Sequence, residues 1–327
     1  MGQLALVEQL RGDQASFLVL GRSAGRGEGK LHGQGFPSSL GCQPTHQRSV
    51  RLLILDGGPE ATALLLLAAH GAAPRYDAVL IPDTGWYPAT AQRALRRLRT
   101  LATGAAMGWE PVTTTPIADR TLNPPGPIPL PLFTLHPDGT RGRLPEGCAR
   151  ARAVALARRI RCLLGHPRPG PVPDGVVAEC SLGIGLEGAH RMIIGPPFIT
   201  FRRPLTGIGW TTPDCRALLL HHGIDPDTGS VCTACPHRSN RSWRHLAATD
   251  PEAFTEATAV DAALRHGPAG PAPRGMPPGT TFFLHPERVP LDQADLSAPD
   301  GPPATGCAPW ACRDRKAPDE GNGGGDR

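Results

Sequence analysis

The sequence predicts an α/β protein, a three-layer α/β/α sandwich with a mostly parallel, Rossmann-like sheet, plus an irregular cysteine-containing C-terminal region. Two observations predict the sheet. The stretches 50–55 and 76–83 are continuous apolar runs, as strands buried on both faces require. A helical pattern follows each run, and this order is typical of parallel sheets with right-handed crossovers. With 327 residues, 39% of them apolar, the chain suits one large domain with appendages or two small domains.

The other elements follow from the positions of Gly, Pro and capping residues. Gly71 ends the first helix, and the helix at 211–223 has Thr212 as N-cap, Pro213 at its first position and Gly223 as its end. The expected strands are 50–55, 76–83, 172–184 and 280–285, with a hairpin around Asp138-Gly139. The expected helices are 62–71, 89–102, 148–164 and 211–223. Two further short helices are expected over 239–267, meeting at Asp250-Pro251.

Charge, hydropathy and cysteine content bear on compartment and partners. The net charge is +5, but only two lysines are present, so the arginine excess indicates coding bias and leaves nucleic acid as a partner open. No apolar run approaches the ~18 residues of a membrane span, and the N-terminus lacks the features of a secretory signal. Nine cysteines without such a signal favour a reducing compartment. We therefore expect a cytoplasmic protein with no membrane partner.

Polar residues follow the first two strands at positions where parallel sheets bind ligands. Helix N-terminal amides meet anions there, and paired glycines let a phosphate approach the backbone closely. The acid and Thr-Gly after the second strand suit a nucleotide or magnesium. The alternatives are a tight turn without a ligand at the first position and a helix cap at the second. The candidate nucleotide-binding residues are Asp56, Gly57, Gly58, Glu60 and Thr62 after the first strand, and Asp83 and Thr84 after the second.

A Cys-x-x-Cys motif, CTACPHR at 232–238, offers two thiolates to one metal ion or cluster. The same motif also occurs as a redox dithiol, and that alternative stays open. A metal would need further ligands. The residues that could supply them are Cys148 at a helix start, Cys215, His237, and Cys307 with Cys312 near the C-terminus.

Taken in order, these motifs resemble the phosphoadenosine-phosphosulfate (PAPS) reductase family, within the adenine-nucleotide alpha-hydrolase superfamily of PP-loop ATP pyrophosphatases. The resemblance covers roughly residues 50 to 312. DGGPEAT stands where the family has Ser-Gly-Gly-x-Asp-Ser, and PDTGWYP matches its Asp-Thr-Gly motif. The later segments that carry the resemblance are CARARAVALARRIRCLLG, RRPLTGIGWTTPDCRALL and CTACPHRSNRSWRHLAATDPEAF.

The resemblance implies a PP-loop fold that binds ATP or another adenine nucleotide, and a [4Fe-4S] cluster held by cysteines, with zinc as the alternative metal. Gly57, Gly58 and Thr62 would contact phosphate, and Asp83 and Thr84 the nucleotide. The implied cluster ligands are Cys148, Cys232 and Cys235, with Cys307 or Cys312 as the hypothetical fourth.

The chain departs from the family pattern at its phosphate loop. Asp56 and Glu60 replace a serine and an aspartate, so two carboxylates stand where phosphates would lie, which is unfavourable unless magnesium intervenes. The lysine that the family places after the middle cysteine is missing. Arg150 and Arg152 are the nearest cations there, and with Arg244 they are the candidates for neutralising substrate oxyanions.

These observations predict four segments and two classes of function. The segments are a disordered leader at 1–48, a nucleotide-binding α/β domain at 49–210, a helical Cys-x-x-Cys module at 211–267 and a Gly/Pro-rich tail at 268–327. The first function is an enzyme that acts on an adenylated or sulfur-carrying substrate, by reduction or by α–β phosphate cleavage, with a thiol reductant protein as partner. The second is an inactive relative that keeps the fold and a structural metal.

Overall fold

The computed structural model describes residues 49–114, 117–122, 130–144, 147–227, 232–266, 276–299 and 309–310. The expected leader at 1–48 and the candidate ligands Cys307 and Cys312 lie outside these residues.

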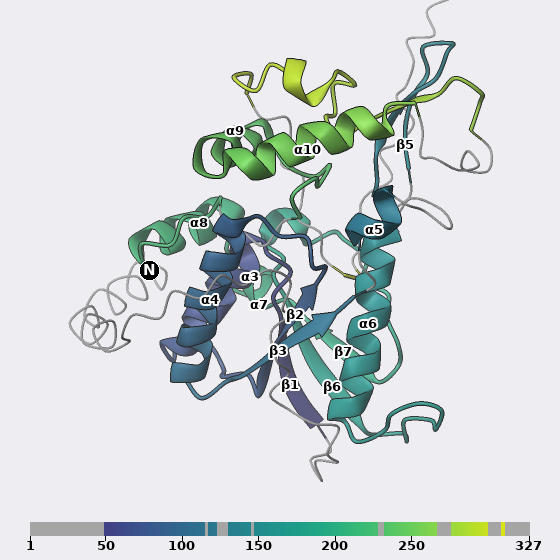
Figure 1. Cartoon of the computed structure of the whole chain (residues 1–327). Helices are drawn as coiled ribbons and strands as arrows, with labels where there is room; N and C mark the ends of the chain where they lie inside the picture. The colour runs from purple at the N-terminus through teal and green to yellow at the C-terminus, as the bar shows by residue number, and fades with distance from the viewer. Residues whose placement is uncertain are drawn as a thin grey trace, which may run out of the picture.

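A five-stranded, all-parallel sheet forms the centre of the α/β part (Figure 1). Its strand order is β3-β2-β1-β6-β7, and every neighbouring pair is parallel, so all carboxyl ends meet at one edge. The order reverses beside β1, which is where open α/β sheets bind ligands. The strands are β1 (Ser49–Ile54), β2 (Ala78–Asp83), β3 (Gly108–Thr113), β6 (Val177–Leu182) and β7 (Ile199–Arg202).

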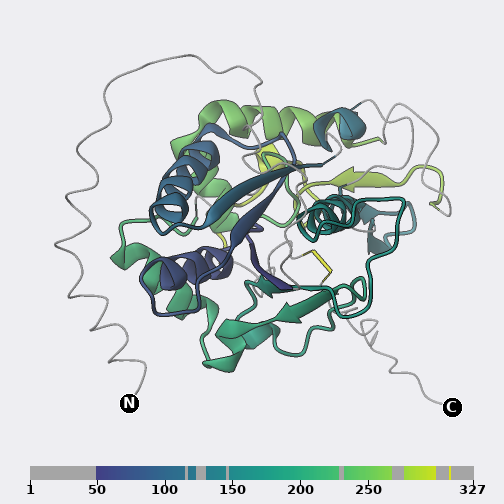
Figure 2. The same cartoon turned by 90° about the horizontal axis from the view of Figure 1, so that it is seen from below.

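Helices cover both faces of this sheet, which confirms the expected three-layer sandwich (Figure 2). Leu53 of β1 packs into one core with α3 (Pro59–Ala69), α4 (Ala89–Gly104) and α8 (Thr212–His221). Leu52 and Ile54 point the other way, into a core that contains Leu156 and Ile160 of α6 (Gly147–Leu163). Because successive strand residues face opposite sides, the uninterrupted apolar run of β1 supplies both cores.

A third core lies outside the sandwich and gathers chain segments that are far apart in sequence. It contains Trp86, Trp243 and Phe282, together with Cys148, Cys232 and Cys235. Residues 276–299, expected within a Gly/Pro-rich tail, therefore contribute to a buried core. The helices around this core are α5 (Ile117–Leu122), α9 (Asn240–Thr249) and α10 (Pro251–Leu264). An antiparallel sheet of order β5-β4-β8 lies beside them. Its strands are β4 (Phe133–Leu135), β5 (Arg141–Arg143) and β8 (Thr281–Phe283). The remaining short elements are α7 (Pro204–Gly207) and two 3-10 turns, Leu186–Gly188 and Leu291–Gln293.

The expected hairpin and the pair of helices that meet at Asp250-Pro251 are confirmed, while two helix starts were wrong. Helix α3 begins at Pro59 rather than at 62, because Gly58 is its extended N-cap and proline suits the first helical position. Thr211, not Thr212, caps α8, since its side chain accepts from the Asp214 amide in a reciprocal capping box.

Strand β3 was not expected. It contains Glu110 and Pro111, which strand propensities disfavour. The structure accommodates both: β3 is an edge strand, where proline is tolerated, and the buried Glu110 carboxylate pairs with Arg159 of α6 at 2.7 Å.

Candidate functional site

The loop that follows β2 and the Cys-x-x-Cys segment pack against each other. The Thr84 hydroxyl Oγ1 lies 3.2 Å from the Cys232 sulfur, and the backbone N–H of Thr233 donates to the carbonyl of Trp86 at 2.9 Å. Two motifs separated by 148 residues in sequence therefore form one site. We call it the thiol site and define it as Thr84, Cys148, Arg152, Cys232, Cys235 and Arg238.

The three cysteines of the thiol site are thiols rather than disulfides and lie in one buried core. The exposed fractions of Cys148, Cys232 and Cys235 are 5%, 3% and 6%. Cys148 occupies the second position of α6, close to the amides of that helix N-terminus, which stabilise negative charge on sulfur.

Two buried guanidinium groups lie beside these sulfurs. Arg152, one turn after Cys148 on α6, donates through Nη2 to the Cys232 sulfur at 3.4 Å. Arg238 donates through Nε and Nη2 to the carbonyl of Cys232 at 3.3 and 3.2 Å. Burial lowers the pKa of Arg238, and the Cys235 and Cys232 sulfurs, then Asp250, act in the opposite direction. Positive charge beside a thiol favours its thiolate form, so the site suits anionic sulfur.

The neighbouring phenol of Tyr87 stays protonated. Its hydroxyl donates to the carbonyl of Pro82 at 2.8 Å. Burial, the largest cause, raises the pKa of Tyr87, and the nearby Arg152 charge opposes that effect.

The chemistry of the thiol site fits a thiolate-bound metal only in part. Three cysteines in one core and two cations beside them match the donor type and charge that such a metal requires. Within the described part of the chain, however, no group of three or more His, Cys, Asp or Glu side chains is arranged to hold a metal ion. In this conformation Cys148, Cys232 and Cys235 are therefore not arranged around one metal ion, and the further candidates Cys307 and Cys312 lie outside the described residues.

Cys215, a sequence candidate, and Cys180, which was not one, lie in other cores than the thiol site, and the candidate His237 is paired with Arg143. Cys215 lies in the core beneath α8, where burial, together with Glu60, raises its pKa. Burial raises the pKa of Cys180, in the core beneath α6, to about 12. Cys162 is disulfide-bonded. His237 bonds with its Nδ1 to Nη2 of Arg143 at 2.7 Å.

The glycine turn, residues 56–62, comprises the loop after β1 and the first turn of α3, and carboxylates of the chain lie against it. The amide of Gly58 donates to Oδ1 of Asp56 at 3.1 Å, so a carboxylate of the chain occupies the helix N-terminus. A Cβ on Gly58 would lie 2.9 Å from Oε2 of Glu60, so this side chain fills the space above the glycine. The hydroxyl of Thr62 donates to the Gly58 carbonyl at 3.1 Å and is used inside the turn.

Glu60 is held by α8. Its Oε1 accepts from the hydroxyl of Thr212 at 2.5 Å, while the amide of Thr212 donates to Oε1 of Glu187 at 2.9 Å. Burial raises the pKa of Glu60, the Thr212 bond lowers it, and the Asp56 and Glu187 carboxylates raise it further. Three carboxylates thus surround the turn, and an incoming phosphate would meet like charge.

A small pocket lies beside the glycine turn. Its wall is mostly apolar and comes from the turn, α4, the end of α8 and the segment that follows α8, with Asp225 as the charged residue. A mostly apolar lining with one carboxylate does not suit a polyphosphate. The lining includes Gly57, Thr62, Leu95, Leu98, Leu219 and Asp225.

The remaining sequence candidates have structural or surface positions. Oδ1 of Asp83 accepts from the Gly85 amide at 2.8 Å and shapes the loop after β2. Arg150 and Arg244 are exposed, and Arg244 donates to the carbonyl of Leu296. Sequence reasoning missed Arg238, which stands three residues after Cys235; the residue type gives no sign that the turn buries it.

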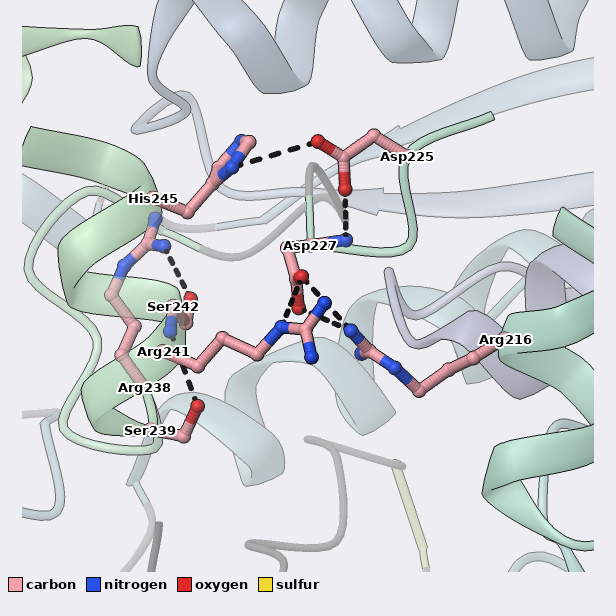
Figure 3. A network of polar contacts seen from close by, with 8 residues as sticks. All are labelled: Arg216, Asp225, Asp227, Arg238, Ser239, Arg241, Ser242 and His245. Atoms are coloured by element: carbon pink, nitrogen blue, oxygen red, sulfur yellow. Dashed lines mark hydrogen bonds and ion pairs between the residues drawn. The ribbon is translucent and has the colours of Figure 1, made fainter. Parts of the chain in front are cut away.

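A polar network fixes the chain on both sides of the cysteines (Figure 3). Asp227 lies between Arg216 of α8, at 2.9 Å, and Arg241 of α9, at 2.7 Å. Burial raises the pKa of Asp227, but the bonds to the two arginines outweigh it, so the net shift is downward. His245 pairs with Asp225 at 3.5 Å, and the Arg238 guanidinium donates to Ser242 at 3.0 Å. The Cys232–Cys235 turn is therefore anchored to α8 and α9.

Comparisons with protein families, with characterised proteins and with solved structures find no match for this chain. Among the described residues, none of the helices has the length and apolar character needed to cross a membrane.

Proposed function

We propose that this protein is a PAPS reductase-like, adenine-nucleotide alpha-hydrolase-like protein that acts on an adenylated or sulfur-carrying substrate beside a cysteine-bound metal centre. One observation carries this proposal: the Asp-Thr-Gly loop at the carboxyl end of β2 contacts the Cys-x-x-Cys turn, with Thr84 Oγ1 3.2 Å from the Cys232 sulfur. A substrate at the carboxyl edge of the sheet would thus lie next to the thiols.

The cysteines and the arginines of the thiol site each have a part in this proposal. Cys148, Cys232 and Cys235 would bind the metal, and Cys307 or Cys312 would complete the set. Arg152 and Arg238 balance the negative charge of the sulfurs and attract an anionic substrate. A [4Fe-4S] cluster would supply one-electron chemistry, with a thiol reductant protein as the electron source, whereas zinc would be structural.

Metal analysis of protein purified without oxygen tests the proposal. We expect iron and acid-labile sulfide, with a broad absorption band near ~400 nm, in the wild type. Cys148→Ser and Cys232→Ser should lose both. Cys180→Ser is the matched control, because Cys180 is equally buried but lies in the core beneath α6. Cys307→Ser and Cys312→Ser show which of the two is the remaining ligand. Wild-type protein without metal would overturn the proposal.

A second candidate is a relative that keeps the metal centre and has lost nucleotide chemistry. The observation that favours it is the glycine turn, where Asp56 and Glu60 occupy the space in which phosphate would bind. Titration of metal-loaded protein with ATP and magnesium, followed by chromatography for AMP and pyrophosphate, separates the two candidates. Binding with α–β cleavage supports the enzyme, and neither binding nor cleavage supports the second candidate.

A further inference from the structure

Helix α4 carries positive charge without compensating negative charge. Its 16 residues include four arginines and no Asp or Glu. Coding bias explains why these cations are arginine and not lysine, but it does not explain the missing acids, because exposed helices commonly alternate the two signs. We call these residues the arginine stripe and define it as Arg93, Arg96, Arg97 and Arg99.

The arginine stripe lies on the outside of the sandwich (Figure 1). Arg93, Arg96 and Arg97 are exposed, and their spacing of three and four residues places them on one face of the helix. Arg99, three residues after Arg96, is partly exposed. The other side of α4, which includes Leu95, packs into the core shared with α3 and α8. The helix is therefore fixed in place with its cations toward solvent.

The chain does not neutralise the arginine stripe. Within the described part of the chain, the side chains of Arg93, Arg96 and Arg99 make no ion pair and no hydrogen bond. Arg97 donates to two backbone carbonyls just after α8, at 2.6 and 3.2 Å, and these acceptors carry no net charge. All four positive charges are therefore uncompensated by the residues around them.

Arginines of other helices are paired with acids. Helix α6 also lacks Asp and Glu, but its Arg159 pairs with the buried Glu110 of β3 at 2.7 Å. Arg216 of α8 and Arg241 of α9 share Asp227, at 2.9 and 2.7 Å. The fold thus supplies partners to arginines elsewhere, and the arginine stripe differs from them in having none among the described acids.

This charge pattern works against the stability of α4 itself. Like charges three and four residues apart destabilise a helix by about as much as opposite charges stabilise it, and Arg93 repels both Arg96 and Arg97 in this way. The helix dipole favours cations in the last turn, yet α4 has no basic residue there. An anionic ligand along the outer face would remove this repulsion.

Three kinds of anionic ligand are disfavoured by the same face. A membrane surface would need an apolar helix side to insert, and that of α4 is buried in the core. A protein interface needs an apolar or aromatic anchor, and of the large apolar side chains exposed in the described residues, none belongs to α4. Single-stranded nucleic acid is held by aromatic stacking, and α4 has no aromatic residue.

The phosphate backbone of a duplex is recognised by positive charge alone. A guanidinium is suited to it, because its fork of donors can bond two phosphate oxygens at once. Arg93 and Arg99 stand about 9 Å apart along the helix axis, whereas one strand of a duplex presents a phosphate every ~3.4 Å. The arginine stripe can therefore meet more than one phosphate.

We propose that the arginine stripe binds the phosphate backbone of double-stranded nucleic acid. This inference is independent of the proposed function, because it concerns the outer face of α4 and involves neither the thiols nor the glycine turn.

Fluorescence anisotropy tests the inference with labelled DNA and RNA duplexes of about 20 base pairs, titrated with the full chain between about 50 and 200 mM KCl. We expect the affinity of the wild type to fall steeply with salt. Arg93→Gln/Arg96→Gln should lower the affinity about tenfold at the lowest salt, and it should reduce the slope of log affinity against log salt by about 1.8, which is 0.9 for each lost phosphate contact. Binding of only one duplex would identify the form recognised.

The matched control is Arg158→Gln/Arg168→Gln. It removes the same charge from two exposed arginines of α6 and the loop that follows it. We expect its affinity to stay within about twofold of wild type. Arg93→Lys/Arg96→Lys keeps the charge and should keep the salt slope, and it decides the test if circular dichroism shows that the glutamine variant is unfolded.

Several outcomes would overturn the inference. They are a wild type that binds neither duplex at the lowest salt, an equal loss of affinity in the control variant, and a lysine variant with a reduced slope. Tighter binding to a single strand of the same length, to poly-glutamate or to phosphatidylserine vesicles would assign the arginine stripe to another ligand and would likewise refute the proposal.

Discussion

The glycine turn and the thiol site lie at the same edge of one sheet, after adjacent strands, and have opposite character. Asp56 and Glu60 gather negative charge at the turn and bond to groups of their own chain. Arg152 and Arg238 gather positive charge around the sulfurs of the thiol site. The fold offers ligand positions along this edge, but the side chains decide which charge each position accepts, so fold resemblance alone does not predict activity.

Because of this difference, the two parts of the proposed function, the metal centre and nucleotide binding, have unequal support. The thiol site has buried thiols with cations beside them, as an anionic centre requires. The glycine turn has Gly57 at φ 96°, a conformation that favours glycine, yet the Gly58 amide and the Thr62 hydroxyl already bond to groups of the chain. Experiments that disturb each region separately therefore test the comparison directly.

The largest effect on stability is expected from Gly183→Ala, which disrupts the packing that supports the glycine turn. Gly183 follows β6, and a Cβ there would lie 2.3 Å from the backbone nitrogen and 2.6 Å from the Cα of Ala61. Both atoms belong to the first turn of α3, so relief requires moving the helix backbone. We expect a loss of about 3 kcal/mol in the free energy of unfolding, measured by urea denaturation.

Gly207→Ala is the matched control for this prediction. Nothing lies within 4 Å of a Cβ at Gly207, in the short helix α7. Its unfolding free energy should stay within about 1 kcal/mol of wild type. If Gly183→Ala were as stable as this control, the close contact between Gly183 and Ala61 would not constrain the turn, and this prediction would be refuted.

This contact also shows how far sequence reasoning reaches. The apolar runs of β1 and β2, and the glycine and proline signals after each helix, predicted most elements of the sandwich, because local pattern and burial agree there. The residues of β3 did not predict a strand, because Glu110 is stabilised there by an ion pair with Arg159, 49 residues away. No local signal reports that Gly183 must meet Ala61.

The candidate site follows the same rule. The motifs around Asp56, Thr84 and Cys232 were recognised separately. The strand order places Asp56 and Thr84 at one edge of the sheet, and Cys232 contacts Thr84 there. Sequence could not predict that Thr84 contacts Cys232, nor that the carboxylates of Asp56 and Glu60 turn back onto the chain. Those contacts depend on long-range packing, which local sequence patterns do not reveal.

A smaller effect, with a distinct pH dependence, is expected from Glu60→Gln. Burial raises the pKa of Glu60 from its ordinary value of 4.5. The folded state therefore binds this proton more tightly than the unfolded state, and stability is lost as pH rises through the folded-state pKa. Glutamine removes that loss. We expect Glu60→Gln to raise the unfolding free energy by about 1 kcal/mol at pH 8, and the gain to vanish below pH 4.5.

Glu252→Gln is a close control, because Pro251-Glu252 opens α10 as Pro59-Glu60 opens α3. Both substitutions remove a carboxylate from a first helical turn, but Glu252 is exposed. Denaturation at several pH values should therefore show the pH-dependent gain in Glu60→Gln only. An equal pH dependence in both variants would mean that the effect of Glu60 on stability comes from charge at a helix terminus and not from burial at the glycine turn.

The smallest effect concerns the opposite end of the α3–α8 pair, where the sign of the pH dependence reverses. The rings of His70 and His222 lie 4.8 Å apart, those of His221 and His222 lie 5.3 Å apart, and Arg97 of α4 donates to the Gly223 carbonyl at 2.6 Å. Burial, then the charges of His70, His221 and Arg97, lowers the pKa of His222 to about 4.

The folded state therefore binds the His222 proton less tightly than the unfolded state, whose pKa is 6.5. The resulting stability is full above pH 6.5 and is lost as pH falls toward 4. We expect His222→Gln to flatten this slope, measured by denaturation between these pH values, while His221→Gln, which keeps the His70–His222 contact, retains most of it. Ionisation of Glu60 would then lower the stability of the α3–α8 pair as pH rises, and protonation of His222 would lower it as pH falls. An unchanged slope in His222→Gln would contradict this assignment and leave the acid dependence to other groups.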